Sequence, residues 1–131
     1  MSSVTVRIAD EPYVTSIKAG PHEIVADEPS ELGGADSGPD PYGLLLASLG
    51  SCKAITASMY ARRKGWPLDA MELDLSHTRE DGFERIDVVI RVFGDLDDTQ
   101  RERLVEIAGK CPVEKTITGE LRVNVRTEAP A

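Results

Sequence analysis

The feature that most constrains this chain is one long apolar stretch, PYGLLLASLGSCKAITASMYARRK, from Pro41 to Lys64. Pro41 suits the first position of a helix because its missing N–H would have no partner there. Asp40 can accept hydrogen bonds from the first free amides. At the other end, three consecutive basic residues suit the negative pole of the helix dipole, and Gly65 suits the left-handed closing conformation. The pattern predicts one helix over 41–64, and a helix this apolar is normally buried.

Cys52 lies near the middle of this predicted helix. Spacings of three and four place it on one stripe with four other residues, Leu45, Leu49, Thr56 and Met59. We therefore expect Cys52 to lie against packed hydrophobic surface. Lys53 follows it directly, but successive helix residues point in different directions, so the sequence identifies no cation that would activate the Cys52 thiol.

Length and charge limit the classes of protein to which the chain can belong. A length of 131 residues predicts a single domain over 1–131. The formal net charge of −8 argues against a nucleic-acid partner, which requires a basic surface. Polar residues interrupt the apolar stretch and the N-terminus lacks a signal-peptide pattern, so we expect a cytoplasmic protein with no membrane association. Two cysteines and two histidines form no recognised ligand spacing, so no metal and no cofactor is predicted.

Shorter periodic segments surround the long helix. Alternating apolar residues predict strands over 4–8, 13–17 and 22–26, and further strands over 71–75 and 83–93 joined by an Asp81-Gly82 hairpin turn. Val89 and Phe93 break the alternation and predict burial of both faces of that last strand. A second helix is expected from 97–99 to Gly109, and a final strand over 121–125. This order predicts an α+β domain with segregated sheets.

Two segments next to these elements allow more than one interpretation. Residues 27–40, DEPSELGGADSGPD, are either a solvated linker or a loop that borders a site. Pro112 suits the start of a short helical turn, which makes Cys111 its N-cap. A thiolate at that position is stabilised by the free amides, so we expect the pKa of Cys111 to be lowered. By themselves, the two cysteines are either buried small hydrophobes or a redox pair.

Three segments carry a resemblance to a known family. They are GPDPY onward to GSC (Gly38 to Cys52), GKCPV (Gly109 to Val113) and PSELGG (Pro29 to Gly34). With them, the sequence resembles the family of osmotically inducible protein C and organic hydroperoxide resistance protein (OsmC/Ohr) over nearly its whole length. The run MYARRKGWPL, Met59 to Leu68, is similar to the broader OsmC-like branch.

The resemblance implies a fold and an activity. The fold is an intertwined homodimer, with curved antiparallel-rich sheets around two main helices and sites at the dimer interface. The activity is a stress-response, antioxidant one: thiol-dependent reduction of organic hydroperoxides, with Cys52 as the peroxidatic thiol and Cys111 as the resolving one. A dithiol would reduce the resulting disulfide, and lipoylated proteins are candidate donors. The scheme requires the two Cβ atoms to come within about 4.5 Å of each other.

One part of the family pattern is missing. The best-studied members place a glutamate, paired with an arginine of the N-terminal sheet, at the position that Tyr42 holds here. No matching arginine is found; the early candidates are Arg7, Lys18 and His22. An alternative is therefore a non-enzymatic dimer that binds a small apolar or acyl ligand at its interface pocket. A third hypothesis, acyl transfer through a Cys52 thioester, lacks an identifiable histidine base.

Overall fold

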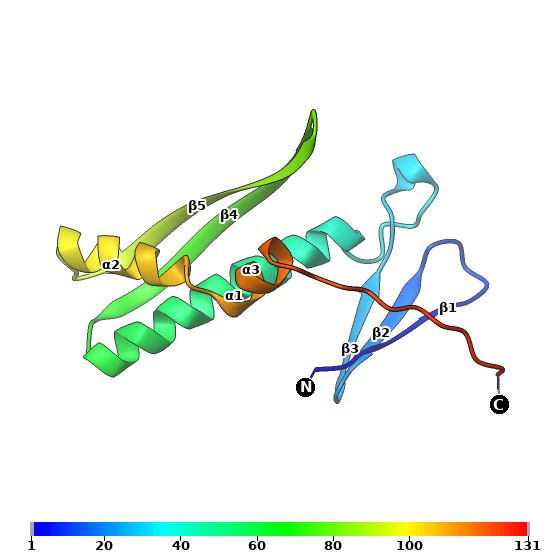
Figure 1. The fold of residues 1–131 in the computed structure, drawn as a ribbon, viewed down its shortest axis with the longest axis horizontal. Helices are drawn as coiled ribbons and strands as arrows, with labels where there is room; N and C mark the ends of the chain where they lie inside the picture. The colour runs from blue at the N-terminus through cyan, green and yellow to red at the C-terminus, as the bar shows by residue number, and fades with distance from the viewer. Residues whose placement is uncertain (1, 131) are drawn as a thin grey trace. The chain divides into compact units, whose positions relative to one another are not determined.

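The computed structural model describes residues 2–130 as an α+β chain (Figure 1). The elements are, in order, β1 (Thr5–Ile8), β2 (Thr15–Ala19), β3 (His22–Ala26), the 3₁₀ turn η1 (Ser30–Leu32), α1 (Pro41–Lys64), β4 (Leu68–Glu80), β5 (Phe83–Gly94), α2 (Asp98–Ala108) and α3 (Pro112–Thr118). They form two compact units. One contains β1–β3 and the hairpin residues Leu75–Val88, and the other contains Leu49–Asp74 and the chain from Val89 onward.

Helix α1 has the bounds that the sequence predicts. Oδ1 of Asp40 accepts a hydrogen bond of 2.9 Å from the Gly43 amide, which is the expected cap of the first turn. Gly65 closes the helix with a φ of 70°. By length and composition alone α1 also passes the test for a membrane span, a test that the core helix of a soluble protein passes equally.

The N-terminal sheet is a three-stranded antiparallel meander in the order β1-β2-β3. Its register pairs Arg7 with Ser16 across β1 and β2, and Ile17 with Ile24 across β2 and β3. The strands confirm the predicted segments to within two residues, and the turn after β1 lies where Asp10-Glu11-Pro12 predicts it. Alternation of apolar residues is thus a sufficient signal for this short-range sheet.

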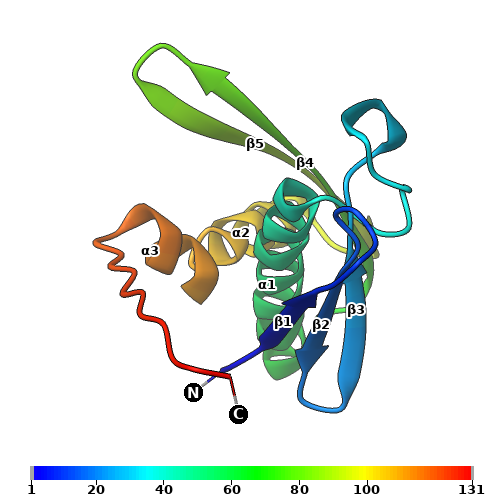
Figure 2. The same cartoon turned by 90° about the vertical axis from the view of Figure 1, so that its right-hand side faces the viewer.

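The core of the second unit forms where α2 packs against α1 (Figure 2). Its buried members are Ala57, Ala61, Leu96, Leu104 and Ala108. Within this chain the buried face of α1 follows four-residue steps through Leu49, Lys53, Ala57 and Ala61. The predicted stripe through Cys52 is wrong in its outer part, because Met59 is 65% exposed. Small alanines let another helix approach closely, so they, and not the bulkier neighbours, face the partner helix.

Helix α2 begins at a capping box, as the acidic and hydroxyl residues at 97–99 predict. The Asp97 side chain accepts from the Gln100 amide at 2.8 Å, and the Gln100 side chain accepts from the Asp97 amide at 2.9 Å. The stripe of Leu104, Ile107 and Ala108 is buried as expected. This reciprocal cap satisfies two amides that the helix itself leaves unbonded.

Two predictions about the later strands are wrong for the described chain. Val89 and Phe93 are exposed on β5, so that strand is not buried on both faces. Residues 121–125 form no strand, and Val123 is 79% exposed. A strand exists only where a neighbouring strand supplies hydrogen-bond partners. Within residues 2–130 no strand pairs with this segment, although its apolar alternation is real.

The loop between β3 and α1 is held by a buried carboxylate and is not a solvated linker. Asp27 is 1% exposed. Its oxygens accept hydrogen bonds from the amides of Glu28, Ala35 and Ser37 and, at 2.6 Å, from the Ser37 hydroxyl. A Cβ on Gly34 would overlap the Glu28 carbonyl oxygen, so only glycine fits that turn. Four donors on one carboxylate fix the path of the chain into α1.

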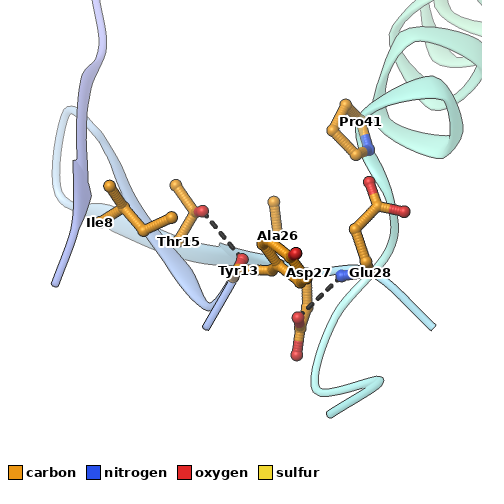
Figure 3. A pocket seen from close by; sticks show the side chains of 7 residues that line it. All are labelled: Ile8, Tyr13, Thr15, Ala26, Asp27, Glu28 and Pro41. Atoms are coloured by element: carbon orange, nitrogen blue, oxygen red, sulfur yellow. Dashed lines mark hydrogen bonds between the residues drawn. The ribbon is translucent and has the colours of Figure 1, made fainter. Parts of the chain in front are cut away.

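Asp27 also lines a hollow of about 170 Å³ (Figure 3). Its other lining residues are Ile8, Tyr13, Thr15, Ala26, Glu28 and Pro41. The Thr15 hydroxyl donates to the Tyr13 carbonyl, so that hydroxyl is occupied as a donor. Because the oxygens of Asp27 already accept four hydrogen bonds, this carboxylate holds the loop.

Asp27→Asn should lower the thermal unfolding midpoint at neutral pH by about 5 °C or more, because an amide cannot accept from all four donors. The Ser37 hydroxyl is the chief cause that holds the pKa of Asp27 below its usual range. The carboxylate therefore stabilises the fold above the ordinary pKa, and this contribution is lost as the pH falls through the lowered value. The difference in unfolding midpoint between the two proteins should begin to narrow below about pH 4 and should keep narrowing at lower pH. Asp36→Asn, at an exposed position, is the matched control; an equal loss there would contradict the assignment.

Candidate functional site

The two cysteines of the chain lie together in the second compact unit. Cys52 comes from the middle of α1 and Cys111 directly precedes α3. They are 4 Å apart, and both are free thiols. Thiols this close can be joined with little backbone movement. The structure therefore brings together the two residues on which the predicted redox chemistry depends.

The two thiols differ in their surroundings. Cys52 is half-buried, whereas Cys111 is 0% exposed. Burial raises the pKa of Cys111, and the hydrogen bond and charge of Cys52 add to this, while the Glu114 amide and the Lys53 ammonium act in the opposite direction. Cys111 is the N-cap of α3, as predicted. The prediction of a lowered pKa is thus wrong, because desolvation outweighs the helix amide.

A buried lysine lies beside the thiol pair. Lys53 is 5% exposed, and its Nζ is 2.6 Å from Oε1 of Glu114. The same ammonium donates a bond of 3.3 Å to the Ala108 carbonyl at the end of α2. A charge removed from water requires such partners. The Glu114 side chain is 40% exposed, so one end of the ion pair reaches solvent.

The sequence pattern alone gives Lys53 no role, because Lys53 and Cys52 point to different sides of the helix. Lys53 in fact belongs to the buried face of α1, and its charge acts on Cys111. A signal was available: Lys53 is the only charged residue between Pro41 and Ala61. A single charge in a helix expected to be buried requires a carboxylate from elsewhere in the chain.

Tyr42 lies in a separate polar cluster, within the first compact unit. Its ring stacks on His77 with the centroids 4.7 Å apart, and its hydroxyl accepts a hydrogen bond of 3.0 Å from Arg79. Glu84 bonds both Arg79 and His77, and the bond from Arg79 is the chief cause that lowers the pKa of Glu84. An arginine does pair with this position, but it comes from β4. The early candidates lie elsewhere, in β1, β2 and β3: Arg7, Lys18 and His22.

Potential metal ligands do not gather anywhere in residues 2–130: no group of three or more His, Cys, Asp or Glu side chains is found there.

The sequence model of the OsmC family, described as OsmC-like protein, matches residues 34–126. An OsmC-like protein of Mycoplasma pneumoniae aligns with a TM-score of 0.77 at 20% identity, covering 96% of each chain. The organic hydroperoxide resistance protein OhrB of Bacillus subtilis aligns with a TM-score of 0.63 at 24% identity, covering 92% of this chain and 93% of its own. The organic hydroperoxide resistance protein OsmC of Legionella pneumophila gives 0.65 at 19% identity, covering 92% and 91%. A comparison with curated protein sequences returned no match.

The unequal burial of the thiols predicts unequal reactivity. With limiting iodoacetamide near neutral pH, we expect Cys52 to be alkylated at least about tenfold faster than Cys111, because access and thiolate fraction both control the rate. Peptide mass spectrometry of the labelled protein would locate the adduct. The same protein in denaturant provides the control, in which both thiols should react at similar rates. Labelling of Cys111 first would contradict the described surroundings.

Proposed function

Because the chain belongs to the OsmC-like protein family, we propose that it is a thiol-dependent peroxidase that reduces organic hydroperoxides. The observation that carries this proposal is the half-buried Cys52 thiol next to the fully buried Cys111 thiol, 4 Å apart. Relatives of the same fold from Bacillus subtilis and Legionella pneumophila are named for organic hydroperoxide resistance. The more accessible thiol would meet the peroxide, and the buried one would resolve the product.

The oxidation half of the cycle has two steps. The Cys52 thiolate attacks the terminal oxygen of the hydroperoxide, the O–O bond breaks, and the alkoxide takes a proton and leaves as an alcohol. Sulfur loses two electrons and becomes a sulfenic acid. The Cys111 thiolate then attacks the Cys52 sulfur. The S–S bond forms, the S–O bond breaks, and the departing hydroxide takes a proton to become water.

The reduction half needs an external dithiol. One of its thiolates attacks the disulfide to give a mixed disulfide, and its second thiol then displaces the protein sulfur. Two electrons and two protons return to the cysteines, and the donor leaves as its own disulfide. A lipoylated protein has this chemistry and is the donor we favour. The cytoplasm, which keeps thiols reduced, is the compartment that suits such a cycle.

The surface near Cys52 favours an apolar substrate over hydrogen peroxide. Ile55 and Met59 lie on the same helix, one and two turns after Cys52, and both side chains are exposed. An alkyl or acyl chain that covered them would remove apolar area from water, at about 25 cal/mol for each Å².

We also propose that the working form is a homodimer. The described chain leaves apolar side chains exposed on β5 and in the C-terminal segment, where Phe93, Val123 and Val125 are examples. The segment 121–125 has the alternation of a strand but no strand partner within residues 2–130. A second copy would supply the partner that this segment lacks.

Cysteine variants test the proposed activity directly. Treatment with one equivalent of cumene hydroperoxide should remove both free thiols and lower the intact mass by about 2 Da, since each thiol loses one hydrogen. Cys52→Ser should abolish peroxide consumption. Cys111→Ser should leave a trappable sulfenic acid and little turnover with dithiothreitol. If neither variant changes consumption, or if the mass does not fall, the peroxidase is excluded and the ligand-binding dimer becomes the better explanation.

The dimer is tested by its mass in solution. Light scattering should give about twice the 14.2 kDa of the chain. Val123→Lys should weaken the association, because it puts a charge on an apolar side chain that we expect to be covered. Arg126→Lys, which keeps the charge of the tail, is the control. A monomeric wild type at micromolar concentration would contradict the proposal.

A further inference from the structure

We propose that Lys53 is a positioning residue that keeps Cys111 available as a thiolate, and that Glu114 limits this effect by neutralising part of the lysine charge. The inference rests on the proposed peroxidase cycle but concerns different residues. It assigns a role to the ion pair of Lys53 and Glu114, which forms and breaks no bond in the cycle.

The geometry singles out this lysine among the cations of the second unit. Lys53 is almost fully buried, and its ammonium is fixed at two points, Glu114 and the Ala108 carbonyl. Both partners lie within three residues of Cys111 in the chain. The ammonium therefore cannot move to solvent without breaking both contacts. Lys110 is closer to Cys111 in sequence, but it is exposed, and water screens its charge.

The chemistry needs a cation at this position in two steps. In resolution, Cys111 has to carry a negative charge to attack the Cys52 sulfenic acid, although burial disfavours that charge. In reduction, an incoming dithiol reaches the half-buried Cys52 sulfur more readily than the fully buried Cys111. The S–S bond then breaks with Cys111 departing as the thiolate, which later takes up a proton. A fixed ammonium stabilises Cys111 as nucleophile in the first step and as leaving group in the second.

Glu114 sets the strength of this effect. The groups identified as acting on Cys111 are Lys53 and Cys52 from α1 and the Glu114 amide from α3. The Glu114 carboxylate lies 2.6 Å from the ammonium, so it offsets much of the positive charge that Cys111 experiences. Because its side chain is partly exposed, its removal leaves Lys53 with a path to water. Loss of the lysine and loss of the glutamate should therefore act on Cys111 in opposite directions.

The first test is a titration of Cys111 alone, in the full-length Cys52→Ser protein, by thiolate absorbance at 240 nm. Adding Lys53→Met should move the midpoint to higher pH, and adding Glu114→Gln should move it to lower pH. Lys53→Arg should stay near the parent, and so should the control Lys110→Met, which removes the same charge from an exposed site. A merely structural role would move both buried-pair variants in the same direction. Shifts of the same sign, or no shift in either, would overturn the inference.

The second test follows the two steps in the protein that retains Cys52. With cumene hydroperoxide, Lys53→Met should form its disulfide about five- to tenfold more slowly, with longer-lived sulfenic acid, because the thiolate fraction controls the attack. Reduction of its preformed disulfide by dithiothreitol should slow similarly. The first oxidation of Cys52 should change much less. Equal disulfide formation and reduction rates in Lys53→Met and wild type would contradict the role.

The outcomes separate this inference from the proposed function. If no protein consumes hydroperoxide, the peroxidase fails, yet the titration still decides whether Lys53 and Glu114 control Cys111. If hydroperoxide is consumed and the titration shows no opposite shifts, only the present inference fails. Circular dichroism would establish that each variant is folded. Should Lys53→Met not fold, Glu114→Gln decides the question, because an unchanged or higher midpoint in that variant refutes the inference.

Discussion

The arrangement of the thiol site depends on one buried ammonium. Lys53 leaves water when α1 packs, and it then needs partners that its own helix cannot provide. It takes one from the last residue of α2 and another from the first turn of α3. These two points flank the short connection that carries Cys111. Satisfying a single charge therefore fixes the backbone on both sides of the second cysteine and brings it to the first.

The site that results has a built-in asymmetry. One sulfur is half-buried on the middle of a long helix, and the other is sealed from solvent at a helix start. Burial alone would make the inner thiol a poor nucleophile, because it raises the pKa of Cys111. The adjacent ammonium opposes that effect. The proposed peroxidase cycle needs one accessible sulfur and one protected sulfur, and the same packing contacts create both conditions.

Membership of the family does not determine every polar contact, and the contacts of Tyr42 depend on this chain's own residues. At the position where well-studied members have a glutamate, Tyr42 stacks on His77 and bonds Arg79, within a network closed by Glu84. This network is built on the β4–β5 hairpin and the start of α1. A tyrosine hydroxyl is a neutral acceptor, so it pairs with the arginine without neutralising it. The family determines the fold, while the polar contacts of Tyr42 depend on this chain's own residues.

The sequence by itself determined the local elements: α1 with its Asp40 cap and Gly65 ending, the meander of β1 to β3, and Cys111 at the start of α3. Capping, turn chemistry and alternation depend on residues a few positions apart, so a linear pattern contains them. Tertiary structure alone decided which face of α1 is buried and that Lys53 meets Glu114. It also decided that desolvation outweighs the helix start at Cys111, and that residues 121–125 have no strand partner within residues 2–130. These depend on which distant segments come together and exclude water, and no local pattern encodes that choice.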